Sequence, residues 1–298
     1  MNQLYQAIGI SKQAVYQYQK RQEEFDQNMI QLLIEVDELR AEHPGCGVEK
    51  MYRTLKPAFI GRDRFIETCM ELGYRIKRKK NYRKTTIPIS HKFPNLIEGL
   101  ILNKENMVWQ SDITYIDLKE RFYYAVFIED VYSRKIVGWE VSDSLRAEAN
   151  VRALKMALKE RPAPIIHHSD RGSQYINKDY LKLLADHQAH VSMGLIAQDN
   201  AYVERLNGTI KNEYLSYWDI QSFRSLKRAL KKAVNHYNSR RLHNSLPGEN
   251  SPIQFEKIPD KERYVAVIHA ENRIFPAEST FSWKNEVIKN ALICPLLK

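Results

Sequence analysis

The sequence has few cysteines and no long apolar run. Its three cysteines (Cys46, Cys69 and Cys294) are widely spaced and odd in number, so they predict neither a disulfide framework nor a Cys-x-x-Cys metal site. No apolar stretch approaches the ~18 residues that a membrane helix needs. The first residues lack the basic and then apolar pattern of a secretory signal. We therefore expect a cytoplasmic protein with reduced thiols.

The sequence has fewer acidic than basic residues. The 298 residues include 46 Lys and Arg against 36 Asp and Glu, which gives a formal net charge of +10, and the sequence pI is about 9.3. A basic surface attracts phosphate groups and releases their counterions, so this balance favours a nucleic-acid partner over simple solubility charge. A hydrophobic content of 43% in a chain of this length predicts a globular protein with more than one domain.

The N-terminal quarter has a helical pattern. Residues 1–22 predict a short helix-turn-helix-like segment that turns at Gly9, with Ser11 as the N-cap of its second helix. Residues 25–76 predict a separate helical DNA-binding domain of the helix-turn-helix type. Its expected helices lie near 25–43, 47–56 and 62–72.

A basic linker is predicted at residues 77–104. Seven of the ten residues in 75–84 are basic, and few regular signals follow. Such a run is often only solvated, but its position between two predicted domains favours contact with DNA phosphates. The linker residues expected to make that contact are Lys77, Arg78, Lys79, Lys80, Arg83 and Lys84.

Residues 105–258 predict an α/β catalytic core. Strands expected at 107–118, 122–130 and 135–142 are rich in β-branched and aromatic residues and would form an antiparallel meander. Helices and strands then alternate, with helices at 146–160, 177–187, 201–216 and 222–239 and strands at 164–168 and 189–193. This order predicts a mixed sheet with helices on its faces. The role of the tail, 259–298, is not predicted, although 264–268 could be a strand.

Three carboxylates stand out in this core: Asp112 within a strand, Asp170 at the end of another, and Glu204 near the start of a helix. Side chains at the carboxyl ends of strands gather where ligand sites form. Carboxylate oxygens bind hard divalent cations, and two such cations can assist a phosphoryl displacement. We therefore predict a metal-dependent nucleic-acid enzyme, although each carboxylate taken alone also fits a structural role.

Other residues near these carboxylates fit structural roles. Asp117 lies near the first hairpin turn, and Asp130 is expected to cap the turn that follows it. His167 and His168 are neighbours on a strand, so their side chains point to opposite faces and cannot easily share one zinc ion.

The predicted helix after Glu204 carries polar residues on one face. Asn207, Gly208 and Lys211 follow Glu204 at helical spacing. This face suits contact with a metal-bound phosphate. It would present a metal ligand, a small polar side chain, a glycine that permits close approach and the positive charge of a lysine. An ordinary Glu–Lys surface helix has the same composition.

Several motifs together resemble DDE transposases of the bacterial "IS three" insertion-sequence family. They lie at 168–175 (HSDRGSQY), 199–213 (DNAYVERLNGTIKNE) and 237–243 (YNSRRLH), and the stretch 45–55 through 72–74 resembles the family's upstream helix-turn-helix. The resemblance covers about two thirds of the chain, and the order of the motifs makes it specific. The family's second-frame product has a retroviral-integrase-like core.

The resemblance implies a ribonuclease-H-like fold and a transposase that cuts and joins DNA. Asp112, Asp170 and Glu204 would be the catalytic triad and would bind Mg²⁺ or Mn²⁺, with two ions expected. Lys211 would contact the end of the insertion sequence, and a C-terminal basic motif would contact DNA. That motif is Arg240, Arg241 and His243. Asn207, on the same helix face as Lys211, is also expected to contact DNA. At least a dimer is expected on double-stranded DNA, because transposition joins two ends.

The chain departs from the family pattern at one loop, and three other functions remain open. Only 33 residues separate Asp170 from Glu204, fewer than in many members, so the loop 193–198 is expected to be short. A retroviral-type integrase would share the chemistry but would carry a His-His-Cys-Cys zinc module. A catalytically inactive DNA-binding regulator is the main alternative. A plain ribonuclease fits poorly with the predicted helix-turn-helix segments.

Overall fold

The computed structural model describes residues 9, 11–76, 93–118, 121–194, 197–259 and 264–268. The chain divides into two compact units. Unit 1 contains Met1–Tyr82, Thr209–Ile220 and Arg228–His236, and the remaining residues form unit 2. The predicted core of 105–258 therefore does not form one unit, because two of its stretches group with the N-terminal helices. In the parts of the chain that the structure describes, no helix is long and apolar enough to cross a membrane.

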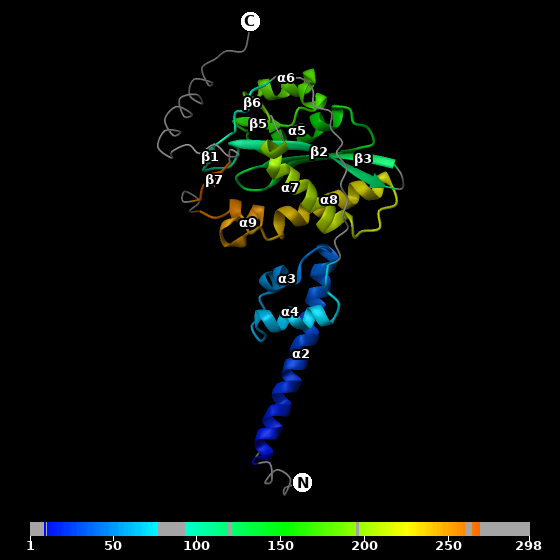
Figure 1. The fold of residues 1–298 in the computed structure, drawn as a ribbon, viewed down its shortest axis with the longest axis vertical. Coiled ribbons are helices and arrows are strands. Elements are labelled where there is room, and N and C mark those ends of the chain that lie inside the picture. Colours follow the sequence, from blue (N-terminus) through cyan, green and yellow to red (C-terminus); the bar gives the residue numbers. More distant parts are fainter. Residues whose placement is uncertain are drawn as a thin grey trace. The chain divides into compact units, whose positions relative to one another are not determined.

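Unit 1 is built on three helices, α2 (Lys12–Glu42), α3 (Val48–Leu55) and α4 (Arg62–Glu71). Figure 1 shows α3 and α4 beside the C-terminal part of α2. Their common core is apolar and includes two free cysteines, as predicted. The buried residues of this core are Leu32, Val36, Cys46, Val48, Met51, Ile60, Phe65 and Cys69.

The predicted boundary between residues 1–22 and 25–76 is wrong, because α2 crosses it as one helix of 31 residues. The side chain of Ser11 accepts a hydrogen bond from the Ala14 amide, which confirms the predicted N-cap. Residues 21–24 contain no glycine or proline and favour helix, so nothing interrupts α2 between the two predicted segments. Residues 1–8 lie outside the described residues.

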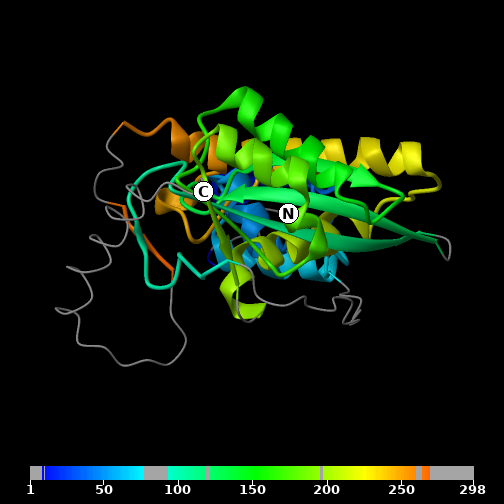
Figure 2. The ribbon, with the colours of Figure 1, turned by 90° about the horizontal axis from the view of Figure 1, so that it is seen from above.

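Unit 2 contains a five-stranded mixed sheet in the order β4-β3-β2-β5-β6. Its strands are β2 (Val108–Leu118), β3 (Arg121–Asp130), β4 (Ile136–Ser142), β5 (Ile166–Ser169) and β6 (His190–Met193). The first three form the predicted antiparallel meander, and β5 and β6 join it in parallel. The long strands β2 and β3 run side by side in Figure 2. This confirms the predicted ribonuclease-H-like mixed sheet.

Helices cover both faces of this sheet. On one face, α5 (Glu148–Glu160) and α6 (Lys178–Asp186) pack over Trp109 and Val126. The other face holds α7 (Ala201–Thr209) and the two ends of α8 (Phe223–Ser239). A π-helical segment, Ile210–Leu215, follows α7 directly. The predicted helix at 201–216 is therefore confirmed, but its second half has wider, π-type hydrogen bonding.

The predicted linker and tail both contribute to unit 2. β1 (Ile101–Leu102) pairs with β7 (Ala266–Val267), so the compact part begins before residue 105 and includes residues after 258. Ile97 and Leu100 pack with Phe255 of α9 (Pro252–Glu256) in a second core cluster. β7 lies within the stretch 264–268 where a strand was expected, whereas the two-residue strand β1 and its distant pairing with β7 were not predicted. The basic residues predicted to contact DNA from the linker, 77–84, lie outside the described residues.

Candidate active site

Asp112 and Asp170 lie on neighbouring parallel strands. β2 and β5 pair in a register that places Gln110 beside His168 and Ser111 beside Ser169. Asp112 and Asp170 come next on the two strands, so their backbones lie side by side at the carboxyl end of β5. The negative charges of both aspartates raise the pKa of the buried Tyr175 phenol, after burial itself. The sheet thus brings together two of the three predicted carboxylates.

The helix that carries Glu204 is attached to the same strand as Asp112. The Gln110 side chain donates a 3.1 Å hydrogen bond to the Asp199 carbonyl and accepts one of 3.4 Å from the Val203 amide. Asn200 adds a 3.2 Å bond to the Ser111 carbonyl. Gln110 and Asn200 are both buried. These bonds hold the start of α7 over the sheet.

Asn207 connects α7 to Asp112. Its Nδ2 donates to Asp112 Oδ2 at 2.7 Å, and the residue is only 5% exposed. The prediction that Asn207 contacts DNA does not fit this burial, because its amide already faces a carboxylate inside the protein. A sequence shows the spacing of Asn207 from Glu204 but not the strand that its side chain reaches.

The surroundings of Asp170 favour its neutral form. Burial raises the pKa of its carboxyl, and a 3.0 Å hydrogen bond from the Gly172 amide to Oδ1 offsets part of that shift. Gly172 has φ −66°, so it is not needed for a left-handed turn. It is needed for space, because an added Cβ would lie 3.0 Å from Asp170 Oδ1 and 2.9 Å from Gln174 Oε1.

Glu204 lies in the first turn of α7 and is exposed. Partial desolvation, and then the charge of Asp170, raise the pKa of its carboxyl. Glu204 is therefore within electrostatic reach of Asp170. Among the described residues, however, no three His, Cys, Asp or Glu side chains are grouped closely enough to hold a metal ion.

The residues of the site fit a hard divalent cation. Asp112 and Asp170 offer carboxylate oxygens from adjacent strands, and such oxygens are the donors that Mg²⁺ prefers. Burial raises the pKa of both Asp170 and Glu204, and the charge of Asp170 adds to the shift at Glu204; a bound cation would favour the charged form of both carboxyls. The two hydrogen bonds described above, from Asn207 to Asp112 and from the Gly172 amide to Asp170, come from neutral donors.

The predicted DNA-contacting residues have different surroundings. Lys211 is half-buried in the π-helical segment and belongs to unit 1. Arg240 is exposed, whereas His243 is 7% exposed and packs its ring against Tyr237 at 4.7 Å. Arg241 lies over the same Tyr237 ring at 5.6 Å. Part of the motif at 237–243 is therefore packed within the fold.

Two histidines near the site have structural partners. His167 Nε2 lies 2.9 Å from the Tyr180 hydroxyl, and His168 Nδ1 lies 2.8 Å from Ser192 Oγ. The two rings contact different partners on opposite faces of β5, so they do not share one zinc ion. Burial lowers the pKa of each imidazole to about 3, so both rings are neutral at physiological pH.

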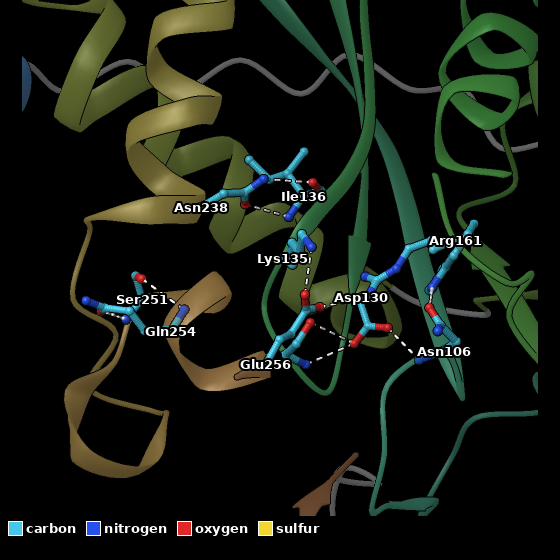
Figure 3. A network of polar contacts seen from close by, with 11 residues as sticks. Asn106, Asp130, Lys135, Ile136, Arg161, Asn238, Ser251, Gln254 and Glu256 are labelled. Carbon is cyan, nitrogen blue, oxygen red and sulfur yellow. Dashed lines mark hydrogen bonds and ion pairs between the residues drawn. The ribbon is translucent and has the colours of Figure 1, made fainter. Parts of the chain in front are cut away.

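Asp130 caps the turn after β3, as predicted. Its Oδ1 accepts hydrogen bonds from the amides of Tyr132 and Ser133, and its Oδ2 accepts one from Asn106. Figure 3 shows Asp130 near Glu256, which forms ion pairs with Lys135 at 2.6 Å and Arg161 at 2.8 Å. This network ties the helix α9 to the end of the sheet.

Two family models match the chain. Both are described as an integrase core domain, and they cover residues 103–197 and 186–252. The matched region contains all three carboxylates and the motif at 237–243.

Several curated proteins of insertion elements are similar to the chain. The 31 kDa protein of insertion element IS600 from Shigella sonnei is 31% identical over 268 residues, which cover 85% of this chain and 97% of that protein. The transposase InsF of insertion sequence IS3fB from Escherichia coli is 31% identical over 229 residues, 74% of either chain. Among solved structures, the HTLV-2 integrase catalytic core domain in complex with magnesium is 20% identical, with a TM-score of 0.43, and covers 54% of this chain and 99% of that one.

Proposed function

Because the chain belongs to the IS3 family of insertion-sequence transposases, with an integrase core, we propose that it binds the ends of an insertion sequence and catalyses DNA strand cleavage and strand transfer. Asp112, Asp170 and Glu204 form its catalytic triad. The observation that carries this proposal is the position of Asp112 and Asp170 at neighbouring places on two parallel strands, with the helix of Glu204 attached to the same strand.

The triad would hold divalent cations, with Mg²⁺ or Mn²⁺ as the expected ions and two as the expected number. Bound there, such cations would activate an attacking oxygen and stabilise charge on the leaving oxygen of the phosphodiester. The chain supplies the carboxylate oxygens and holds them in place. Asn207 fixes the rotamer of Asp112 through its 2.7 Å hydrogen bond, and the Gly172 amide fixes that of Asp170.

Double-stranded DNA is the proposed partner, both at the insertion-sequence ends and as target. The net charge of +10 supports this. Unit 1 would bind DNA through its helices, and Lys211, Arg240, Arg241 and the basic residues of 77–84 would contact phosphates. The buried His243 would act by supporting Arg241, whose Nη1 lies 3.4 Å from its ring nitrogen. At least a dimer is expected on DNA, because two ends must be joined.

Strand cleavage by single-residue variants tests the proposed function. Glu204→Gln, Asp112→Asn and Asp170→Asn should each reduce cleavage of an end-containing duplex in Mg²⁺ by about a thousandfold or more, with DNA affinity unchanged. Asp117→Asn is the matched control, since Asp117 is an exposed carboxylate on the same strand.

Full activity of Glu204→Gln would refute the triad. If the unaltered chain binds the DNA ends but does not cleave them in Mg²⁺ or Mn²⁺, the chain is instead a DNA-binding regulator with an inactive core.

A further inference from the structure

Unit 1 contains a tight contact between the turn after α2 and the π-helical segment Ile210–Leu215. The amide of Gly45 donates a 2.7 Å hydrogen bond to the Glu213 carbonyl. His43 Nε2 lies 2.6 Å from Glu213 Oε2, and the His43 side chain is almost completely buried. We call the contact formed by His43, Gly45, Glu213 and Tyr214 the seam.

The seam requires glycine at position 45. A Cβ added there would overlap Glu213 Cα and would lie 2.8 Å from the Glu213 carbonyl oxygen. Both atoms belong to backbone, so no side-chain rotation could relieve the overlap. Gly47, two residues later, has nothing within 4 Å of an added Cβ. A side chain can therefore be added at position 47 without a clash, but not at position 45.

Aromatic rings extend the seam to α8. The His43 ring stacks on Tyr214, with centroids 4.8 Å apart and planes 9° apart. The Tyr214 hydroxyl lies 3.0 Å from Nδ1 of His236, and Tyr214 is fully buried. Lys232 of α8 adds a 3.3 Å bond to the Ala41 carbonyl. The end of α2, the π-helical segment and α8 are therefore held together by several independent contacts.

The π-helical segment is an unusual place for such a contact. A π-type turn is rare and is less favourable than continued α-helix, so it persists where other contacts fix it. Here the Glu213 carbonyl accepts a hydrogen bond from the Gly45 amide. The Lys211 carbonyl accepts hydrogen bonds from both the amide and Oγ of Ser216. The segment begins at the residue that follows α7, the helix carrying Glu204 and Asn207.

We propose that the seam positions the catalytic helix: His43, Gly45 and Glu213 fix the π-helical register of Ile210–Leu215, and that register sets the placement of Glu204 and Asn207 on α7. The N-terminal helical unit would then contribute to strand cleavage as well as to DNA binding. His43, Gly45 and Glu213 act as positioning residues and do not touch the DNA. This inference rests on the proposed function of Glu204.

Gly45→Ala tests the seam, with Gly47→Ala as the matched control. Gly45→Ala should slow single-turnover cleavage about 10- to 100-fold at saturating DNA, because small misplacements of catalytic groups have effects of this size. DNA affinity should change little. Hydrogen–deuterium exchange gives a readout that does not depend on activity: the amides of 201–215 should exchange about tenfold faster in Gly45→Ala than in Gly47→Ala.

Glu213→Ala and Glu213→Gln provide a second test if Gly45→Ala does not fold. Glu213→Gln keeps an oxygen that can accept from the His43 ring and should retain near-normal cleavage, whereas Glu213→Ala should lose about tenfold. Equal cleavage and equal exchange for the Ala and Gln variants would overturn the positioning role. So would equal behaviour of Gly45→Ala and Gly47→Ala.

The outcomes separate this inference from the proposed function. If Glu204→Gln retains cleavage, the catalytic assignment fails whatever the seam variants do. If Glu204→Gln is inactive while the seam variants cleave and exchange like their controls, only the positioning role fails.

Discussion

At the scale of single residues, the site combines carboxylates with neighbours that fix them. Asp112 and Asp170 follow paired positions of β2 and β5, and each has a hydrogen-bond donor at 3.0 Å or less, Asn207 and the Gly172 amide. The carboxylates alone would repel one another. Their donors hold them in place, and in the proposed function a bound cation would compensate the charge.

Asn207 offers a direct test of this arrangement. Asn207→Ala should slow cleavage about 10- to 100-fold, because a hydrogen bond to a charged group contributes about 1.5–3 kcal/mol. Asn207→Asp should be at least as slow, since it places a second negative charge against Asp112. Single-turnover cleavage at saturating DNA measures both. Wild-type rates for both variants would show that the contact has no role in the reaction.

Glu129 predicts a pH dependence of stability. It is almost completely buried, and burial raises the pKa of its carboxyl to about 8, although Arg134 opposes the shift. The unfolded chain releases this proton near the ordinary glutamate value of 4.5, while the folded chain keeps it. The unfolding free energy should therefore fall as pH rises from about 4.5 to about 8.

Glu129→Gln should remove this fall. Relative to the variant, the unaltered chain should lose up to a few kcal/mol between pH 5 and pH 8. Urea denaturation across this pH range measures the difference. A difference that does not change with pH would contradict a raised pKa at Glu129.

Individual residues were predictable from sequence where a local pattern identified them. Asp130 caps its turn as predicted because the signal lies within four residues. The partner of Asn207 was not predictable, because Asp112 lies 95 positions away. Gln110 was also missed, although a polar side chain at a buried strand position is a signal that could have identified it.

At the scale of elements, local pattern predicted most of unit 2. The strands and helices from 107 to 239 lie close to their expected positions because alternation and helical spacing persist over several residues. The sequence-based predictions failed where an element was short or depended on a contact with a residue far away in the chain. The two-residue strand β1 and its pairing with β7 were not predicted, although β7 lies within the expected strand at 264–268. Helix α2 continues through a predicted boundary that contains no glycine or proline.

The packing of β4 on α5 depends on one glycine. An added Cβ at Gly138 would overlap the Ala153 carbonyl oxygen and would lie 3.1 Å from the Ala157 Cβ. Gly138→Ala should therefore destabilise the protein by about 1–3 kcal/mol, the usual effect of overpacking. Thermal unfolding measures it, with Gly61→Ala as a control where the added Cβ meets nothing within 4 Å. Equal melting temperatures would contradict the close approach of β4 and α5.

At the scale of the whole molecule, the chain combines a basic charge with an acidic site. The net charge of the whole chain is +10, which favours binding to DNA. The three carboxylates all lie within the region that matches integrase core models. The composition could predict the class of partner but not the division into units. Residues 209–220 and 228–236 group with the N-terminal helices through contacts such as Gly45 to Glu213.

The basic run at 77–84 predicts a salt dependence of DNA binding. Replacing Lys77, Arg78, Lys79 and Lys80 by Ala should reduce the slope of log affinity against log salt by up to about 4, roughly one for each phosphate that these side chains neutralise. The preference for end-containing over random DNA should not change, because phosphate contacts carry no sequence information. Fluorescence anisotropy over a salt series measures both. An unchanged slope would remove this run from the proposed DNA contacts.

In the proposed function, Asp112, Asp170 and Glu204 hold the divalent cations that promote DNA cleavage. Asp170→Cys tests this role. A thiolate is a poor ligand for Mg²⁺ but accepts softer ions better. We expect Asp170→Cys to bind DNA normally, to lose cleavage in Mg²⁺ and to regain part of it in Mn²⁺. Asp170→Ala should stay inactive in both. Equal cleavage by Asp170→Cys and the unaltered chain in Mg²⁺ would contradict the metal-binding role of these carboxylates.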